Sequence, residues 1–493
     1  MASSNVTQVP HASGRTASAN GSPIYESSLA LLSVVLLGTV LRLVALGHKS
    51  FWLDEIASVA ISRRPGPVFW HFLWHDEGNM ALYYVLLKPW LHFGYGEATV
   101  RLLSVITGAV AIPIMYGLGS RLFGRRVGIL SAGLLAVNAC AVAVSQEARA
   151  YSFVVLFVLL STYLFVRLIE EPSSCAVLLY AFVAGLTCYF HYYGVLVPAA
   201  HAVSIMAIPA TRRRWKPLLL AWTVIALLAA PILWLIHAQD VGHISWLQPP
   251  SWLELYHLGV FLAADGGKAI GGVLLGLELI LAGFFVAACR SAWRAAGDDL
   301  LRWRYALVAS AVVMPILLTL LVSIVRPAFY HRFLIICLPG WLLTIAVGAL
   351  HIRVGAWRVV AIACVCILSL FSMVRLYSSV TEDWRSAVMY LVAHARPDDR
   401  VLYYQSVGQF AGESYRDWLL PADAPRPVST GINPANSDWQ REIDHAPRVW
   451  LVLYRTEPGD AEAHAIEREL SQHYELGREE NFPRVTVLEY GAK

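Results

Sequence analysis

Apolar runs long enough to cross a lipid bilayer recur along most of the chain, and they stop before its C-terminal part. A bilayer core needs about 20 apolar residues per helix, so each run is a candidate transmembrane span, and the pattern predicts about eleven of them. We expect these spans at residues 27–46, 98–118, 127–145, 151–168, 174–191, 194–210, 217–237, 269–289, 305–325, 332–350 and 357–376.

Composition supports the same conclusion. Hydrophobic residues make up 57% of the 493 residues and charged residues only 15%, whereas soluble domains are nearer a quarter charged. A soluble fold cannot bury that much apolar surface, so lipid must cover part of it. The net charge of +4 gives no reason to expect a nucleic-acid partner, and the seven cysteines lack metal-ligand spacing, which favours a core role.

The positions of the basic residues predict the orientation in the membrane. If the apolar segment 79–95 does not cross, most of the arginines between spans fall on one side, which the positive-inside rule assigns to the cytoplasm. We therefore predict that residues 64–95 form juxtamembrane helices on the outer surface. The basic residues in question include Arg121, Arg125, Arg126, Arg167, Arg212, Arg213, Arg214, Arg290, Arg294, Arg302, Arg304, Arg353 and Arg358.

Three regions follow from these patterns. Residues 1–24 are rich in Ser, Ala, Thr and Gly and are expected to form a disordered cytoplasmic tail. Residues 25–378 form the α-helical transmembrane domain. Residues 379–493 are more polar, with strand-like runs at 401–404, 449–454 and 485–489 and helical stretches between them, which predicts a small extracytoplasmic α/β domain.

The first candidate for chemistry is a pair of adjacent carboxylates, Asp54 and Glu55, which follow the first span closely. Trp52 and Leu53 beside them provide an apolar setting that can raise a carboxylate pKa and suit it to general-base work. A solvated acid pair in a loop explains these two residues equally well when they are taken alone.

Further polar clusters fall on the same predicted side, between later spans. Several Arg and His groups at one depth, facing a carboxylate pair, match what a phosphate-bearing lipid headgroup needs, because guanidinium groups bind phosphate bidentately. A single Arg at the end of a span is more often an interface anchor. The candidate phosphate-binding residues are Arg149, His191, Tyr192, Arg326, Tyr330 and Arg332.

A metal site is not predicted. His71, His75, Asp76 and Glu77 could contribute ligands, but a solvated face of an interfacial helix explains them as well. The sequence has no phosphate-binding loop of the Walker type and no GxGxxG motif that opens a helix. We therefore expect no cofactor, although a divalent metal is compatible with the sequence.

Together these motifs resemble the bacterial GT-C glycosyltransferases of the protein-mannosyltransferase type, which include the aminoarabinose and galacturonic acid transferases of lipid A. The resemblance covers roughly residues 27–395 and lies in the order and spacing of several motifs. One position departs from it, because many members have His or Lys and then Pro-Pro where this chain has Asn79-Met80-Ala81. The matching segments are Trp52–Glu55, Ala81–Tyr84 with Glu97, Arg101 and Ser104, Ser145–Ser152, His191–Gly194, Tyr330–Arg332 with Pro339, and Glu382–Arg385.

The resemblance implies a GT-C fold and a reaction. A sugar would move from a polyprenyl-phosphate carrier to a lipid, glycan or protein acceptor outside the cytoplasm, in one inverting step at the bacterial inner membrane. By resemblance Asp54 would be the general base, Glu55 and Arg149 active-site residues, and Arg332 or His191 phosphate contacts.

Two other classes of function compete with this hypothesis. A transporter or flippase for a lipid-linked saccharide would be expected to place ionisable residues at mid-bilayer and often to show repeated halves. No repeat is evident, and the ionisable residues gather at one predicted face. A membrane scaffold with an external binding domain would not account for the carboxylate pair or the outer arginines.

Overall fold

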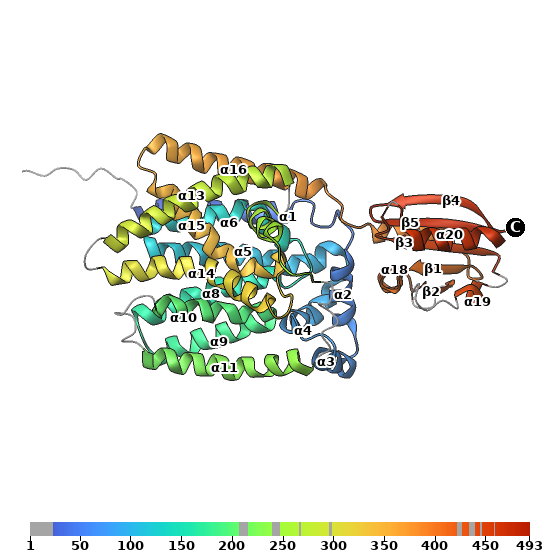
Figure 1. Ribbon diagram of the computed structural model, residues 1–493, viewed down its shortest axis with the longest axis horizontal. Coiled ribbons are helices and arrows are strands. Elements are labelled where there is room, and N and C mark those ends of the chain that lie inside the picture. Colours follow the sequence, from blue (N-terminus) through green and yellow to red (C-terminus); the bar gives the residue numbers. More distant parts are fainter. Residues whose placement is uncertain are drawn as a thin grey trace, which may run out of the picture.

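A computed structural model shows a bundle of long helices joined at one end to a smaller domain that contains a β-sheet (Figure 1). It describes residues 23–206, 215–238, 247–265, 268–294, 298–421, 426–432, 439–443, 446–457 and 459–493. The predicted disordered tail, residues 1–24, therefore lies almost wholly outside the described residues, as do Arg212, Arg213 and Arg214.

Long helices make up most of the bundle. Among the described residues, seven helices are long and apolar enough to span a membrane, and a bent pair raises this number to eight. The protein is therefore a multi-pass membrane protein. The helices of the bundle are α1 (Pro23–Leu43), α5 (Glu97–Phe123), α6 (Arg125–Val137), α7 (Ala139–Ser145), α8 (Tyr151–Glu170), α9 (Ser174–Phe190), η2 (Tyr192–Val195), α10 (Leu196–Met206), α11 (Trp215–Ala238), α12 (Trp252–Ala264), α13 (Lys268–Arg294), α14 (Asp299–Ser323), η5 (His331–Cys337), α15 (Leu338–His351) and α16 (Gly355–Ser378).

Each of the eleven predicted spans coincides with a helical segment of the structure. Seven coincide with the long helices, and the span predicted at 127–145 is the bent pair α6–α7. The spans predicted at 27–46, 174–191 and 194–210 coincide with shorter apolar helices, so the number eleven stays a prediction. The apolar helix α12 lies between the spans predicted at 217–237 and 269–289, where the sequence pattern predicted no span.

Asn138 breaks the span between α6 and α7, and the two helices meet at an angle of 59°. Its side-chain oxygen accepts a hydrogen bond from the Ala141 N–H at 2.8 Å and thereby caps α7. Its amide nitrogen donates to the carbonyl oxygens of Leu262 and Ala263 at the end of α12, at 2.9 and 3.3 Å. A polar residue inside an apolar segment thus satisfies backbone groups that the bend frees.

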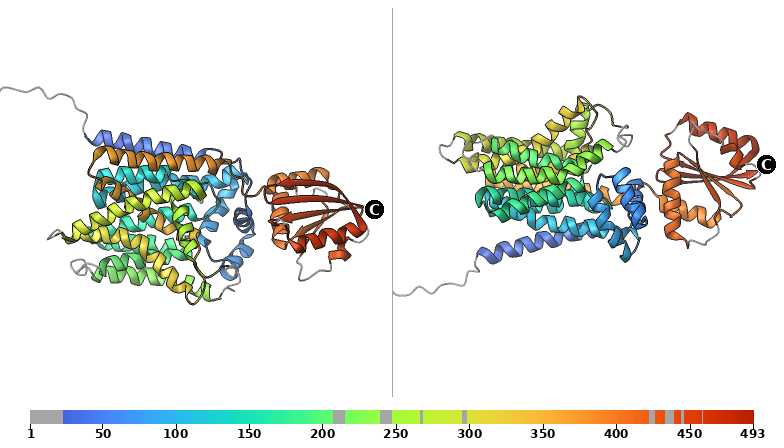
Figure 2. Two further views of the ribbon diagram at one scale, coloured as in Figure 1. Left: turned by 45° about the horizontal axis from the view of Figure 1, so that its top comes forward. Right: turned by 90° about the horizontal axis from the view of Figure 1, so that it is seen from below.

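Three short helices cover the end of the bundle beside the smaller domain (Figures 1 and 2). They are α2 (Leu53–Arg63), α3 (Gly66–His75) and α4 (Ala81–Trp90), which continues into the short 3₁₀ helix η1 (Leu91–Phe93). The ten residues of α4 extend only about 15 Å, too short to cross a bilayer. The structure therefore agrees with juxtamembrane helices between residues 64 and 95.

The smaller domain contains a five-stranded mixed sheet with the order β2-β1-β3-β5-β4. The strands β2, β1 and β3 run parallel, and β5 pairs antiparallel with both β3 and β4. Helices cover both faces, because α17 and α18 pack with one set of buried side chains and α19 and α20 with the other. The elements are α17 (Trp384–His394), β1 (Arg400–Tyr404), α18 (Ser406–Leu419), β2 (Val428–Ile432), α19 (Trp439–Ile443), β3 (Arg448–Tyr454), α20 (Ala461–His473), β4 (Tyr474–Phe482) and β5 (Val485–Ala492).

Candidate active site

Asp54 and Glu55 lie in the first turn of α2, at the end of the bundle that faces the smaller domain. Although they are neighbours in sequence, their environments differ. The Glu55 side chain is fully buried, whereas 41% of the Asp54 side chain is exposed. Only Asp54 is therefore accessible to a substrate in this structure.

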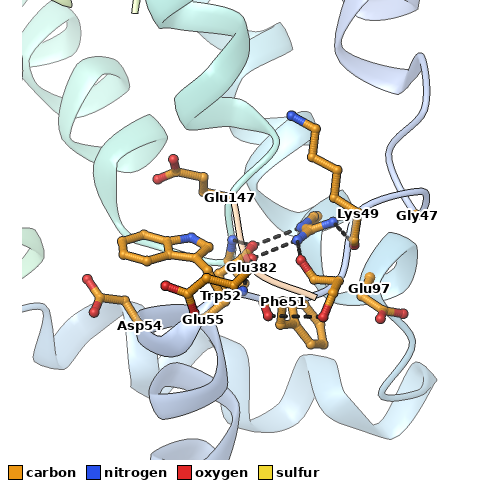
Figure 3. A network of polar contacts seen from close by, with 12 residues as sticks. Gly47, Lys49, Phe51, Trp52, Asp54, Glu55, Glu97, Glu147 and Glu382 are labelled. Atoms are coloured by element: carbon orange, nitrogen blue, oxygen red, sulfur yellow. Dashed lines mark hydrogen bonds and ion pairs between the residues drawn. The ribbon is translucent and has the colours of Figure 1, made fainter. Parts of the chain in front are cut away.

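Glu55 is held in a buried ion pair with Arg101 of α5, at 2.6 and 2.8 Å. It also accepts hydrogen bonds from the Ala148 N–H at 2.7 Å and the Trp52 N–H at 3.3 Å. Arg101 donates in addition to three carbonyl oxygens of the segment before α2, at 2.9 to 3.0 Å. With all of its acceptor capacity in use, Glu55 fixes the geometry around Asp54 and does not offer a free base (Figure 3).

Asp54 faces Arg149, which comes from the short turn between α7 and α8. The Arg149 guanidinium lies 3.6 Å from the Asp54 carboxylate and 3.4 Å from the Asp54 carbonyl oxygen and the Ser58 hydroxyl. Burial lowers the pKa of Arg149, but Asp54 together with Tyr84, Tyr151 and Glu77 raises it by more, and the net shift is upward. Arg149 therefore stays protonated beside Asp54.

Arg332, at the start of η5, lies in the same cluster. Its guanidinium pairs with the Glu147 carboxylate and lies 5.2 Å from the ring centres of Trp52 and Tyr151. Aromatic rings close to a guanidinium favour one orientation of it and partly shield it from water.

His191 and Tyr192 follow α9 and border the same cluster. The His191 ring packs against Phe333 and Tyr151, and its Nδ1 accepts a hydrogen bond from the Tyr193 N–H at 3.2 Å. An accepting Nδ1 fixes the neutral tautomer with the proton on Nε2. The Tyr192 N–H donates to the side chain of Asn79 at 3.2 Å, so the residue that departs from the family pattern supports this turn.

Three buried nitrogen atoms around the site have no hydrogen-bond partner among the described residues: Nε of Arg149, Nε of Arg332 and Nε2 of His191. All three are donors. Buried donors are ordinarily satisfied, because leaving one unpaired costs about 1–3 kcal/mol. Their gathering at one place indicates a site for a ligand that supplies several acceptor oxygens.

Tyr330 and Arg326 are the remaining predicted phosphate-binding residues. The structure places Tyr330 in the cluster and Arg326 outside it. The Tyr330 ring packs against His331 and Phe333, beside Arg332. Arg326 is exposed, and the ion pairs between described residues do not include it. The structure thus brings Asp54, Glu55, Arg149, His191, Tyr330 and Arg332 together with Tyr192 at the border, and leaves Arg326 outside the cluster.

Metal ligands are not gathered in the described part of the chain, where no group of three or more His, Cys, Asp or Glu side chains could hold an ion. His71 and His75 stack on each other at 4.1 Å on the exposed face of α3. The absence of a cofactor stays a prediction.

Asp265, a residue that the sequence analysis did not consider, ends α12 in a left-handed conformation with φ of 53°. Burial raises its pKa to about 7; Arg332 opposes the shift and Glu147 adds to it. Its charge therefore acts on the Arg332–Glu147 pair. The signal in the sequence is an Asp directly after the apolar run 252–264, which lies between two predicted spans.

Comparison with protein families gives a match to the model for dolichyl-phosphate-mannose-protein mannosyltransferase over residues 84–237. No curated protein sequence matches the chain. The matched segment includes Arg149 and His191.

Solved structures resemble the chain over almost its whole length. The crystal structure of ArnT from Cupriavidus metallidurans bound to undecaprenyl phosphate has a TM-score of 0.60 at 14% identity, over 94% of this chain and 97% of that one. Apo ArnT gives 0.63 at 11% identity, over 95% and 98%. The archaeal oligosaccharyltransferase AglB from Archaeoglobus fulgidus, in complex with an inhibitory peptide and a dolichol-phosphate, gives 0.56 at 11% identity, over 88% and 70%. At these identities the likeness establishes a common fold.

Proposed function

Because the chain has the GT-C fold of these membrane glycosyltransferases, we propose that it transfers a sugar from a polyprenyl-phosphate carrier to an acceptor on the extracytoplasmic face of the membrane. The observation that carries the proposal is the accessible Asp54 carboxylate beside buried arginine and histidine donors that lack partners. Two proteins that share the fold have been solved with polyprenyl phosphates: ArnT with undecaprenyl phosphate and AglB with a dolichol-phosphate.

The reaction is a single displacement at the anomeric carbon of the sugar. An acceptor O–H or N–H attacks this carbon, the bond from the carbon to the phosphate oxygen breaks, and configuration inverts. Asp54 takes the proton of the acceptor, and the polyprenyl phosphate leaves with the electron pair of the broken bond. Arg149 and Arg332 lie where they can stabilise the charge that develops on the phosphate.

The donor site has the features that a phosphate with an apolar tail requires. Arg332 lies close to the rings of Trp52 and Tyr151, and His191 is neutral with a proton on Nε2. The surrounding helices are apolar, so a polyprenyl chain can remain in the bilayer while its phosphate reaches the end of the bundle.

A flippase for a lipid-linked saccharide is the alternative. Such a protein needs polar groups along its transport path through the bilayer. In the described part of the chain, the buried Glu278 of α13 is already engaged with the Trp341 indole N–H at 2.6 Å. Three of the buried donors without a partner, Nε of Arg149, Nε of Arg332 and Nε2 of His191, lie around Asp54 at one end of the bundle, which favours chemistry at a fixed depth.

Substitution of Asp54 by Asn tests the proposal. Asn has nearly the same shape but cannot take a proton, and general-base catalysis typically contributes about 10²–10⁴ in rate. We expect single-turnover transfer from a saturating polyprenyl-phosphate sugar to fall by at least about 100-fold, with the affinity for the donor little changed.

Asp76→Asn is the matched control, because Asp76 is exposed at the end of α3 and takes no part in the cluster. It should transfer at the wild-type rate. Glu55→Gln is less informative, since it leaves the buried Arg101 without its charge partner. An Asp54→Asn protein that keeps more than about a tenth of the wild-type rate would exclude Asp54 as the base.

A further inference from the structure

The smaller domain contacts the segment that carries Asp54 through buried side chains. We propose that this domain holds residues 47–55 in the conformation needed for transfer, with Glu382 as the central positioning residue. This inference rests on the proposed function for its kinetic consequence, although its structural part can be tested separately.

Glu55 in the first turn of α2 accepts the N–H of the N-cap residue Trp52, but the N-cap side chain itself makes no capping hydrogen bond. Trp52 occupies the N-cap position, where Ser, Thr, Asp or Asn normally accepts a hydrogen bond from the first turn. Glu382 supplies the missing acceptor from a position 329 residues away, because its Oε2 accepts the Leu53 N–H at 3.0 Å. The residue after Leu53 is Asp54, so this bond fixes the backbone next to the proposed base (Figure 3).

Glu382 is itself fixed within the smaller domain. It is buried, and its Oε2 also accepts the Trp384 indole N–H at 3.1 Å. Its Oε1 accepts the Tyr454 hydroxyl at 2.9 Å and the Arg455 guanidinium at 2.5 and 3.1 Å. Tyr454 is the last residue of β3 and Arg455 follows it, so the carboxylate connects the sheet directly to α2.

Tyr415 of α18 makes a second connection. Its hydroxyl accepts the Phe51 N–H at 2.6 Å and donates to the Glu97 carboxylate at the start of α5, at 3.0 Å. Arg385 adds hydrogen bonds to the carbonyl oxygens of Gly47 and His48, at 3.3 and 2.7 Å. Backbone groups between residues 47 and 53 are thus bound by three side chains of one domain.

These contacts differ from ordinary packing between domains, because they end on backbone atoms of the active-site segment. Loosening them allows Asp54 to move relative to Arg149, and small displacements of a catalytic group commonly cost about 100-fold in rate. Donor binding should be affected less than turnover, since Arg149, His191 and Arg332 come from other parts of the bundle and Arg332 keeps its ion pair with Glu147 when Trp52 of the loosened segment moves.

Hydrogen exchange of the full-length protein tests the structural part. Glu382→Gln keeps the shape, but Arg455 retains the remaining oxygen and the new amide N–H₂ faces the Leu53 N–H, which it cannot accept. We expect faster amide exchange in peptides covering residues 50–56, and Tyr415→Phe should accelerate exchange in the same peptides through Phe51. Unchanged exchange there in both variants would overturn the proposal.

Asp399→Asn is the matched control. Asp399 is also a fully buried carboxylate of the smaller domain, where it accepts from Arg448 and the Trp450 indole at 2.8 and 2.9 Å. It does not contact residues 47–55, so exchange in peptides 50–56 and the rate of transfer should remain those of wild type. Equal acceleration in Asp399→Asn would mean that general loosening of the domain is responsible, which would overturn a specific role for Glu382.

The kinetic part uses a saturating polyprenyl-phosphate sugar. We expect Glu382→Gln and Tyr415→Phe to lower kcat at least about 10-fold, with the donor Kd within about twofold of wild type. Loss of donor affinity with unchanged kcat would overturn the positioning role. If wild-type protein transfers no sugar at all, the proposed function fails, and the exchange experiment alone decides whether the domain holds the segment.

Discussion

At the level of single residues, the adjacent carboxylates Asp54 and Glu55 lie in different environments. The sequence singled out both Asp54 and Glu55, because acids beside apolar residues near a membrane surface are unusual. It could not show that Glu55 pairs with Arg101, since the two are 46 residues apart and Arg101 lies within an apolar run. The charge pattern also gave Arg326 the same weight as Arg332, whereas Arg332 is half-buried beside two aromatic rings and Arg326 is exposed.

Removal of either of the half-buried arginines, Arg149 or Arg332, should weaken binding of the donor. A charge-assisted hydrogen bond contributes about 1.5–3 kcal/mol, so Arg149→Ala and Arg332→Ala should each raise the donor Kd roughly 10- to 100-fold. The measurement is titration of purified, folded protein with a polyprenyl phosphate.

Arg326→Ala provides the comparison, because it removes the same charge from an exposed position. Its Kd should change less than threefold. Equal weakening in all three variants would indicate that net positive charge, rather than this cluster, attracts the phosphate.

At the level of elements, the apolar patterns of the sequence predicted the buried strands and missed the exposed ones. In the smaller domain, the predicted strands at 401–404, 449–454 and 485–489 are β1, β3 and β5, the three inner strands of the sheet. The strands β2 and β4 lie at its edges, and β4 is almost entirely exposed along Tyr474–Phe482. An exposed edge strand carries no alternating apolar signal, so the sequence gives no reason to expect it.

Close packing of α13 against α15 depends on a glycine. A Cβ at position 348 would overlap the carbonyl oxygen of Leu281 and lie 3.2 Å from the nitrogen of Phe285, both backbone atoms that cannot move separately. Small residues allow membrane helices to approach closely. Gly348→Ala should therefore lower the thermal midpoint and the yield of folded protein.

Gly283→Ala is the control for this substitution, because a Cβ there meets no atom within 4 Å. Gly to Ala within a helix otherwise favours the helix by about 0.5–1 kcal/mol. Its thermal midpoint, followed by size-exclusion chromatography after heating in detergent, should equal or exceed that of wild type. A Gly348→Ala protein as stable as Gly283→Ala would show that the two helices can separate at no cost.

At the level of the whole molecule, the active site is assembled from segments that are far apart in sequence. The one-sided distribution of arginines predicted that residues 52–55, 146–151, 191–194 and 326–332 lie at one face, and the structure brings most of them together. Which side chains pair could not be predicted, because Glu147 and Arg332 are separated by 185 residues and Leu53 and Glu382 by 329. Pairing at that distance depends on how the helices pack.

The orientation of the whole molecule gives the last prediction. Helix α16 has 24 residues and is about 36 Å long, which exceeds the roughly 30 Å of a bilayer core. The turn 352–354 before it and the domain after it must then lie on opposite sides. The turn contains Arg353, with Arg358 in the following helix, so the positive-inside rule assigns this end to the cytoplasm. An epitope inserted at residue 353 should be protected from antibody in spheroplasts, one after Lys493 should be accessible, and both should react after permeabilisation. Both epitopes on one side would show that α16 does not cross the membrane. A reversed pattern would place Asp54 on the cytoplasmic side and would contradict transfer on the extracytoplasmic face.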